Sequence, residues 1–432
     1  MAVRVLEWTS RITRSAVDKR PFARVAMVIA PRSSLREESP QQYAARAAPA
    51  AWSPLHIVLL DYRDIRHPEA GGAEQYLNEI FQRVAAYGHR VTLLSARYPG
   101  AKAEDRIGRI RVLRAGNTAT ANFTGARAAL ALARRERVDV FVESICKLPF
   151  LLPVLTKIPV VPVVHHLFGR TIFYQLNPLV AAYAWLYEKL IPSCYRGLRF
   201  VAVSQSTAED LASRGVRLSR MDIVYNCVDF DTYGLPAGST QRSDAPLLLY
   251  VGRFRRYKQI DIVIRAFARA RQALPAARLA LVGKGDDEPR LRALVRSLGV
   301  SDAVSFVGYV SEAEKIRWLH RAHALVYPSP KEGWGISTIE AAACGTPVLA
   351  SDSEGLRDAV RHGETGFLVP HTDVQAWAAR MTELLTDADL RARLGAASHQ
   401  WARQFDWDVE AEKMRRIIEE VVAQSPPSDR GG

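Results

Sequence analysis

Residues 324–351 read ALVYPSPKEGWGISTIEAAACGTPVLAS, and this stretch decides the fold. An apolar run at 324–329 is followed by a loop with two glycines, by a helical pattern through Glu340 and by a second apolar run at 347–351. Two short buried strands with a helix between them predict a βαβ unit, whose strands are parallel. The stretch therefore predicts an α/β fold.

The same alternation continues upstream of this unit in two series. The second series has apolar runs at 247–252, 277–283 and 304–308, with helical patterns at 261–273, 289–298 and 312–322. The first series has apolar runs at 55–60, 91–94, 138–142, 161–165 and 199–204, with helical patterns at 77–88 and 126–137. A Gly/Pro/Ser-rich stretch, 233–246, separates them and predicts a linker. We expect two doubly wound parallel-sheet domains that face each other across a cleft, because ligands of such sheets bind beyond the carboxyl ends of the strands.

The remaining segments complete the predicted domain organisation. The first 54 residues carry nine Lys or Arg against four Asp or Glu and show no sustained periodicity, which predicts a flexible basic extension. The chain is accordingly divided into five parts: 1–54, the two Rossmann-like domains 55–240 and 241–400, a C-terminal helical segment 401–424, and a tail 425–432.

The charge balance points to an anionic partner without identifying it. The 59 Lys and Arg exceed the 45 Asp and Glu by 14, which suits a nucleic acid, a nucleotide phosphate or an acidic membrane. The four cysteines are far apart and include no C-x-x-C pair, so we expect a reducing, cytoplasmic location. No uninterrupted apolar run reaches the length of a membrane span.

The most specific candidate site lies at 331–343, KEGWGISTIEAAA. Glu332 and Glu340 frame a turn in which two glycines flank an aromatic residue, and Ile336 shares a helical face with Glu340. Glycines allow a ligand to approach the backbone, and ionised carboxylates accept several hydrogen bonds from a hydroxyl-rich ligand such as a sugar or a ribose. The alternative interpretation is an ordinary helix start with solvated glutamates.

A second candidate site is the basic loop VGRFRRYKQI at 251–260. Arg253 and Lys258 follow a predicted strand end, where two cations can neutralise a diphosphate. The alternative is a solvated basic loop, and we expect Arg255 and Arg256 to face solvent.

Three weaker signals accompany these sites. Gly71-Gly72 stands between a predicted strand and helix, a position that suits a tight turn as well as a phosphate. His165 and His166 end an apolar strand, where histidine is more often structural than catalytic. Two D-x-D pairs, at 229–231 and 406–408, are interpreted as turn and cap residues, so no metal site is predicted.

Taken together, these residues resemble the retaining GT-B glycosyltransferases of family four. The resemblance extends from about Leu55 to the last helix and rests on GGAE, VHH, VAVSQST, IVYNCVD, YVGRFRRYK, LVGKGD, VSFVGYV and EGWGISTIEAAACGTPVLAS, in the order of the family. The E-x7-E element, combined with an Arg and a Lys five positions apart, is its most specific part. Gln259 stands where the family often has glycine, and Trp334 where phenylalanine is common.

The resemblance implies a metal-independent enzyme that uses no cofactor. It implies transfer of a hexose from a UDP- or GDP-linked donor to the hydroxyl group of a sugar, glycan, lipid-linked or small-molecule acceptor. The half at 55–240 would bind the acceptor, the half at 241–400 would bind the nucleotide sugar, and the helix in 401–424 would cross back to the first half.

It also implies roles for individual residues. Arg253 and Lys258 would hold the diphosphate, and Glu332 would bind the donor sugar. Glu340 would bind the ribose. His165 would touch the transferred sugar, although the adjacent His166 leaves the choice of histidine open. The other residues implied at the nucleotide sugar are Gly71, Gly72, Gly252, Gly333, Trp334, Gly335 and Ile336.

Two other functional classes compete with this interpretation. An epimerase or phosphorylase of the same fold would use the same donor site. A non-enzymatic nucleic-acid-binding protein would explain the positive charge, but the sequence has no helix-turn-helix signature and no zinc-ligand spacing.

A final feature is the aromatic and aliphatic segment at 171–200. Leu179, Tyr183, Leu186, Tyr187 and Leu190 form one face of a predicted helix, and basic residues follow it. One interpretation is shallow contact with an anionic membrane, peripheral on its inner face, which would bring a lipid-linked acceptor to His165. The other is that this face packs against the domain core.

Overall fold

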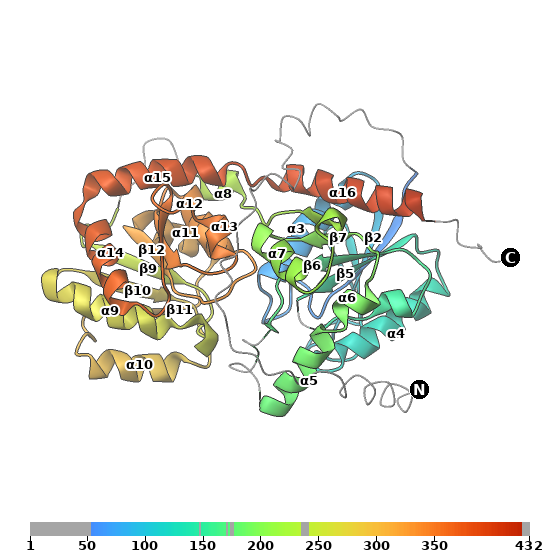
Figure 1. The fold of residues 1–432 in the computed structure, drawn as a ribbon, viewed down its shortest axis with the longest axis horizontal. Coiled ribbons are helices and arrows are strands. Elements are labelled where there is room, and N and C mark those ends of the chain that lie inside the picture. The colour runs from blue at the N-terminus through green and yellow to red at the C-terminus, as the bar shows by residue number, and fades with distance from the viewer. Residues whose placement is uncertain (1–52, 147, 170–171, 173–176, 235–241, 426–432) are drawn as a thin grey trace, which may run out of the picture. The chain divides into compact units, whose positions relative to one another are not determined.

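The apolar runs of the sequence form two separate β-sheets in a computed structural model that describes residues 53–146, 148–169, 172, 177–234 and 242–425 (Figure 1). Both sheets are built from parallel strands with helices between them, which confirms the predicted α/β, two-sheet fold class. The extension predicted at 1–54 lies outside the described residues except for residues 53 and 54, as does the tail at 425–432 except for residue 425.

The first sheet has eight strands in the order β3-β4-β2-β1-β5-β6-β7-β8. All neighbours are parallel except β3 and β4, which pair antiparallel. The order reverses between β1 and β5. The strands are β1 His56–Leu60, β2 Arg90–Ser95, β3 Glu104–Ile107, β4 Ile110–Arg114, β5 Val140–Ile145, β6 Val160–Val164, β7 Phe200–Ala202 and β8 Met221–Ile223.

The second sheet has six parallel strands in the order β11-β10-β9-β12-β13-β14. Its order reverses between β9 and β12, the arrangement of a doubly wound nucleotide-binding sheet. The strands are β9 Leu247–Val251, β10 Arg278–Val282, β11 Val304–Gly308, β12 Ala324–Tyr327, β13 Val348–Ser351 and β14 Gly366–Val369.

Helices cover both faces of the first sheet because its strands are apolar on both sides. Ile57 and Leu59 of β1 belong to the apolar cluster that contains the helix at Gly72–Ala86, whereas Val58 and Leu60 belong to the cluster that contains the helix at Ala121–Ala133. The α-helices of the described chain are α3 Gly72–Ala86, α4 Ala121–Ala133, α5 Pro178–Glu188, α6 Ile191–Cys194, α7 Gln205–Ser213, α8 Phe230–Tyr233, α9 Ile260–Ala273, α10 Glu288–Ser297, α11 Glu312–Arg321, α12 Ile336–Ala343, α13 Leu356–Ala359, α14 Val374–Thr386, α15 Ala388–Ala402 and α16 Trp407–Gln424.

The structure differs from the sequence prediction in a few elements. The hairpin of β3 and β4 was not predicted, because β4 alternates buried and half-buried residues and has no continuous apolar run. The short strands β8 and β14 were also missed, as were the helices α6, α7, α8, α13, α14 and α15. Helix α4 begins at Ala121, earlier than the predicted start at Ala126, because its first turn has few of the large apolar residues on which a helical period is recognised.

The last helix, α16, packs along α3 of the first half (Figure 1). Its buried side chains include Met414, Ile417 and Ile418. Glu419 accepts a hydrogen bond from the buried His89 ring, and Glu410 accepts one from the backbone NH of Tyr225. Within the described residues, no helix has both the length and the apolar character needed to cross a bilayer.

A buried ion pair fixes the loop after β1 to the end of β4. Arg114 Nε donates to Asp64 Oδ2 over 2.7 Å, and the two side chains are 1% and 0% exposed. Ser95 Oγ donates to the same carboxylate oxygen at 3.2 Å. Removing one partner would leave a buried charge without its counter-charge.

Arg114→Met is therefore expected to destabilise the protein by about 3–5 kcal/mol, because Asp64 loses its buried partner. The midpoint of urea unfolding measures the loss. Arg66→Met is the matched control, since Arg66 pairs with Asp105 but its side chain is 53% exposed, and its unfolding midpoint should stay close to that of the parent. Equal losses in the two variants would show that the burial of Arg114 has no energetic consequence.

Candidate active site

The candidate residues of the second half gather where its strand order reverses. Arg253 and Lys258 follow β9, and Glu332 follows β12, the strand hydrogen-bonded to β9. The carboxyl ends of parallel strands lie on the same edge of a sheet, so the topology brings these distant segments together.

A buried ion pair joins the two segments. Lys258 is 7% exposed, and its ammonium group contacts Glu332 Oε1 and donates to Tyr327 Oη over 3.2 Å. Burial lowers the pKa of Lys258, but the Glu332 carboxylate and the neighbouring tyrosines outweigh this effect and raise the pKa well above its ordinary value. Lys258 is therefore charged, and its charge is balanced by Glu332.

The backbone after Lys258 adopts a left-handed conformation. Gln259 has φ +50° and ψ +42° and stands as the N-cap of α9. Glycine reaches this region at no steric cost, whereas other residues pay roughly 1–2 kcal/mol. The turn thus has the backbone conformation that glycine would favour, but Gln259 occupies it and is strained there.

Arg253 and Arg255 have different surroundings. Arg253 is exposed, and a Cβ atom added to Gly71 would lie 2.5 Å from its Nη2 atom. Arg255 does not simply face solvent as expected, because its side chain is 39% exposed and pairs with Asp286 at 2.9 Å and with Glu69 at 3.5 Å. Arg256 is exposed.

Glu340 lies in the middle of α12 and is 3% exposed. Its Oε1 atom accepts hydrogen bonds from Lys315 Nζ at 2.9 Å and from Tyr233 Oη at 3.1 Å. Lys315 also pairs with Glu312 at 3.0 Å. Glu340 is thus held in one orientation, with its charge balanced by Lys315.

Sequence analysis missed Lys315 and Tyr233. Lys315 stands in the polar helix α11, where no spacing relates it to the E-x7-E element. Tyr233 ends the short helix α8, inside the stretch interpreted as the start of the linker. Their positions follow only from the packing of α8 and α11 against α12.

Three glycines allow the two halves to approach each other closely. A Cβ atom at Gly333 would collide with the carbonyl oxygen of His165, and one at Gly72 would lie 2.6 Å from Ile336 Cδ1. Gly71 approaches Arg253 in the same way. A larger residue at Gly333 would collide with backbone and push the two loops apart, whereas at Gly71 and Gly72 it would displace the ends of the Arg253 and Ile336 side chains.

The backbone around Trp334 places α12 and its side chain. Gly335 has φ +88°, a conformation that favours glycine, and forms the N-cap of α12. The Trp334 ring is 3% exposed and packs against Tyr225 and Phe405, each with ring centroids 4.9 Å apart. Its side chain therefore belongs to an aromatic cluster in the protein interior. Gly252 follows β9, and a Cβ atom there would lie 2.9 Å from Tyr250 Oη.

The two histidines stand at the carboxyl end of β6, next to Gly333. His165 is 5% exposed, its ring meets Tyr76 edge-on at 5.2 Å between centroids, and its Nε2 atom has no hydrogen-bond partner within the described chain. His166 packs edge-on against Phe168, and the charges that act on it include those of Glu332, Lys258 and Arg253. The His166 ring therefore lies near the charges of the candidate site, whereas the His165 ring packs against Tyr76 and its carbonyl oxygen lies next to Gly333.

Further contacts join the halves at the same edge. Lys331 pairs with Asp210 of α7 at 3.0 Å, and Asp358 Oδ2 accepts from the Ser206 amide at 2.7 Å, at the N-terminus of α7. The backbone NH of Gly71 donates to Glu74 Oε2 at 2.8 Å, which fixes the first turn of α3.

The acidic pairs of the D-x-D type cap helices. Asp406 accepts from the amides of Asp408 and Val409 at the start of α16, and Asp229 accepts from the Thr232 amide at the start of α8. Among the residues that the structure describes, no three His, Cys, Asp or Glu side chains gather as a metal site would require.

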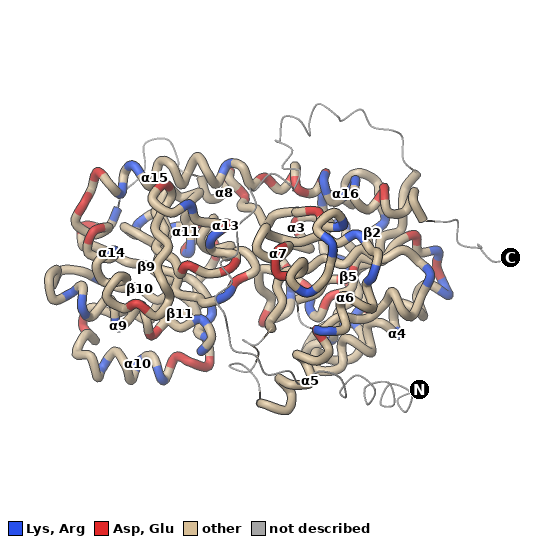
Figure 2. Tube along the Cα trace, viewed as in Figure 1, with Lys and Arg blue, Asp and Glu red and all other residues tan. Residues whose placement is uncertain are grey.

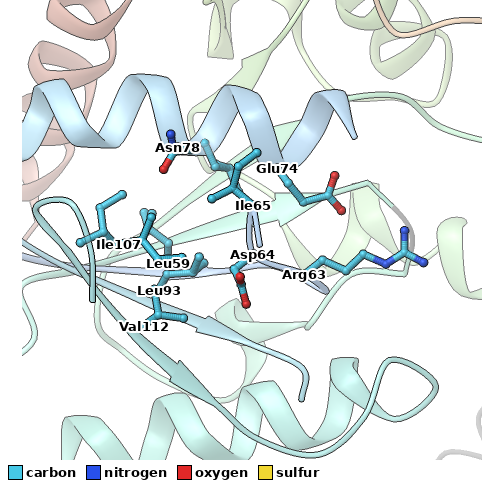
Figure 3. Close-up of a pocket in the computed structure, with 11 residues that line it drawn as sticks. Leu59, Arg63, Asp64, Ile65, Glu74, Asn78, Leu93, Ile107 and Val112 are labelled. Atoms are coloured by element: carbon cyan, nitrogen blue, oxygen red, sulfur yellow. The ribbon is translucent and has the colours of Figure 1, made fainter. Parts of the chain in front are cut away.

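One small cavity lies in the first half, away from these residues (Figure 3). It has a volume of about 10 Å³, space for roughly one water molecule, and lies between the sheet and α3. Glu74, Arg63 and Asp64 are at its rim, and the rest of its lining is mostly aliphatic. It is too small to hold a sugar.

Two family models match consecutive parts of the chain. Residues 70–232 match the model described as Glycosyltransferase Family 4, and residues 235–401 match Glycosyl transferases group 1. The curated relatives include D-inositol 3-phosphate glycosyltransferases of Thermobispora bispora, 37% identical over 44% of this chain and 45% of the relative, and of Xylanimonas cellulosilytica, 32% identical over 52% and 58%. The chain thus spans about half the length of the curated relatives that it matches.

Solved structures share the fold over most of the chain. A sucrose-phosphate synthase from Thermosynechococcus elongatus has a TM-score of 0.72 at 24% identity and covers 86% of this chain and 100% of its own. A HepE protein of Anabaena, solved with UDP-glucose, has a TM-score of 0.65 at 20% identity and covers 85% and 99%. WaaG, described as a glycosyltransferase involved in lipopolysaccharide biosynthesis, has a TM-score of 0.66 at 19% identity and covers 84% and 99%.

The surroundings of the two histidines predict that neither ring titrates near neutral pH. Burial, with a smaller contribution from His166, lowers the pKa of His165 to about 3. Burial lowers the pKa of His166 to about 4, and the attraction of Glu332 only partly opposes it. Both rings should therefore be neutral at pH 6, and the signals of these two rings should not shift in histidine NMR spectra recorded between pH 8 and pH 5.

His165→Asn and His166→Asn identify the two signals in these spectra. Because the unfolded chain binds protons at these rings near pH 6.5 and the folded chain does not, the rings should reduce stability as the pH falls below about 6.5. A ring that titrates with an ordinary pKa would contradict the burial of the site.

Proposed function

Since the chain belongs to glycosyltransferase family 4, with its second half in the glycosyl transferases of group 1, we propose that it transfers a hexose from a nucleotide-diphosphate sugar to an acceptor hydroxyl with retention at C1. The donor is UDP- or GDP-linked, and the acceptor hydroxyl belongs to a lipid-linked sugar, a glycan or a small molecule. The observations that carry this proposal are the buried ion pair of Lys258 with Glu332 and the contact of Arg253 with Gly71, all in loops next to the points where the sheets reverse their strand order.

The cations suit a diphosphate that bridges the two halves. The Arg253 guanidinium lies against the backbone of Gly71, in space that a side chain at position 71 would need, so this cation of the second half reaches the loop of the first half. Lys258 is charged and buried, so a phosphate oxygen close to it would be strongly stabilised in surroundings from which water is excluded. Glu332, now paired with Lys258, would accept hydrogen bonds from the donor sugar. Glu340 would accept them from the ribose.

The proposed reaction breaks the bond between C1 of the sugar and the diphosphate oxygen. The acceptor oxygen forms the new C1–O bond on the same face of the sugar, through an oxocarbenium-like state, and its proton passes to an oxygen of the leaving phosphate. Arg253, Lys258 and the amides at the start of α12 would stabilise the negative charge that develops on the diphosphate. A metal ion would not be needed to stabilise this negative charge.

His165 is the proposed contact to the transferred sugar. Its ring is neutral at physiological pH, and its buried Nε2 atom has no partner in the described chain, so a sugar hydroxyl could satisfy it. His166, nearer to the charges of Glu332 and Lys258, is the alternative.

UDP-glucose in the HepE structure supports a UDP-hexose donor, and the names of the curated relatives support a polyol or sugar acceptor. The proposed location is cytoplasmic, with peripheral contact at the inner face of the membrane when the acceptor is lipid-linked. An epimerase would instead turn over without an acceptor, and a phosphorylase would require free phosphate.

Donor binding should raise the melting temperature without a divalent cation. In EDTA, a panel of UDP- and GDP-hexoses should contain one donor that stabilises the protein, by about 2.7 kcal/mol at a concentration of 100 times its Kd. With this donor and an acceptor, release of the nucleotide diphosphate should proceed at the same rate in EDTA as in manganese. Activity that EDTA abolishes and manganese restores would contradict the proposed charge stabilisation.

Lys258→Ala and Glu332→Ala should each reduce kcat/KM by about a hundredfold or more, equivalent to about 3 kcal/mol of lost transition-state stabilisation. Arg255→Ala should reduce it only a few-fold, since Arg255 makes partly exposed ion pairs with Glu69 and Asp286. Initial rates of nucleotide release measure all three. In the same assay, His165→Ala should lose more activity than His166→Ala.

An Arg255→Ala variant as impaired as Lys258→Ala would show that Arg255 binds the donor. A Lys258→Ala variant with unchanged kcat/KM would disprove the assignment of the diphosphate site.

A further inference from the structure

Helix α5 exposes an apolar face that no described residue covers. Leu179, Val180, Tyr183 and Leu186 are 82%, 52%, 46% and 58% exposed, and we call these four residues the α5 face. The opposite side of the helix, with Ala181 and Ala184, is buried. Of the helix face predicted from the sequence, Leu179, Tyr183 and Leu186 are exposed, whereas Tyr187 is half-buried and Leu190 lies beyond the end of α5. The three exposed side chains do not pack against the core as one interpretation expected, and membrane contact stays a prediction.

The neighbouring helix α4 adds to this surface. Tyr187 of α5 lies close enough to Asn122, in the first turn of α4, for the Asn122 side chain to affect the pKa of its hydroxyl. The next residue, Phe123, is 62% exposed. Exposed aromatic and aliphatic side chains on two adjoining helices are typical of a surface that meets a partner.

The charges around the α5 face are of one sign. Helix α4 contains no Asp or Glu, and the acidic residue of α5, Glu188, is buried and pairs with Arg214 at 3.0 Å. Arg127 on α4 and Lys189 at the end of α5 are exposed, and Lys189 lies over the Trp185 ring at 3.6 Å. Figure 2 shows α5 mostly in tan, the colour of uncharged residues. An apolar face with a cationic rim is complementary to anionic lipid headgroups over acyl chains.

The same helix is fixed to the loop that follows the candidate histidines. The Glu188 carboxylate accepts hydrogen bonds from the amides of Phe168 at 2.7 Å and Gly169 at 2.9 Å. Only Leu167 separates Phe168 from His166. A partner surface bound to α5 would therefore also lie close to this loop.

We propose that the α5 face is a lipid-docking surface that inserts shallowly into an anionic membrane and presents a lipid-linked acceptor to the histidines at the end of β6. The choice of acceptor rests on the proposed function, whereas the docking itself does not. Insertion is shallow because the helix is short and lies along the protein surface, so its apolar side chains reach only the boundary between headgroups and acyl chains.

Co-sedimentation of the full chain with vesicles tests the docking. The protein should bind vesicles that contain phosphatidylglycerol, bind phosphatidylcholine vesicles at least tenfold less, and lose binding as the salt concentration rises. The double variant Leu179→Gln/Leu186→Gln should reduce binding to anionic vesicles at least tenfold. Tyr309→Gln is the matched control, because Tyr309 is 81% exposed on the second half, and it should leave binding unchanged.

Three outcomes would overturn the proposal. The first is absence of binding to anionic vesicles at low ionic strength, and the second is unchanged binding by the double variant. The third is a dimer of the parent chain, seen by light scattering, that the double variant dissociates, because a second copy would then cover the α5 face. The melting temperature of the double variant should equal that of the parent, since both leucines are exposed.

Donor binding separates this proposal from the proposed function. The double variant should keep the thermal shift with the donor, because the α5 face lies outside the donor residues. A parent chain that binds vesicles but shows no shift with any nucleotide sugar would contradict the transferase function and leave the docking surface intact. A chain that binds a donor but no vesicles would keep the function and require a soluble acceptor.

Discussion

The ion pair between Lys258 and Glu332 is the constraint on which the rest of the site depends. A buried ammonium group is tolerated only when a counter-charge and further hydrogen bonds balance it, and Glu332 and Tyr327 provide both. The two charges come from loops after neighbouring strands, so the strand order of the second sheet determines that they meet. A diphosphate would bind to a cation that is already fixed in place. It would exchange one anionic partner for another, while the released carboxylate turns to the sugar.

A similar arrangement supports the second glutamate. Lys315 and Tyr233 bind one oxygen of Glu340, and Lys315 balances its charge. Both glutamates of the E-x7-E element therefore have a lysine partner that balances the carboxylate charge. Tyr233 belongs to the segment that leads from the first half into the second, so the path of the connection contributes to the orientation of Glu340.

Patterns of apolar residues were sufficient to predict the two sheets and most of their strands, because these strands are buried on both sides. The hairpin of β3 and β4 was missed because Arg111 interrupts the half-buried side of β4 and Arg114 ends its buried side, so the strand has no continuous apolar run. The site residues that form recognisable spacings, such as Glu332 and Glu340, were found together with Lys258. Lys315 was not found, because only the packing of α11 on α12 brings it to Glu340, and no local pattern records that contact. The burial of Lys258 and the ion pairs of Arg255 are likewise properties of tertiary packing. The sequence shows two adjacent histidines, but it does not indicate that the His165 ring contacts Tyr76 while the His166 ring lies near the charged residues.

The position of α16 affects the order in which the parts of this protein can finish folding. The helix is made after the whole second half, yet it covers α3, which is made before that half. Until residues 407–424 have emerged, the apolar side of α3 that receives Met414 and Ile418 stays exposed to water. The apolar side of α3 in the first half therefore cannot be buried by α16 before the second half has been synthesised. Domains, in contrast, generally fold in the order of synthesis. The nascent chain would spend most of its synthesis with this face open to chaperones.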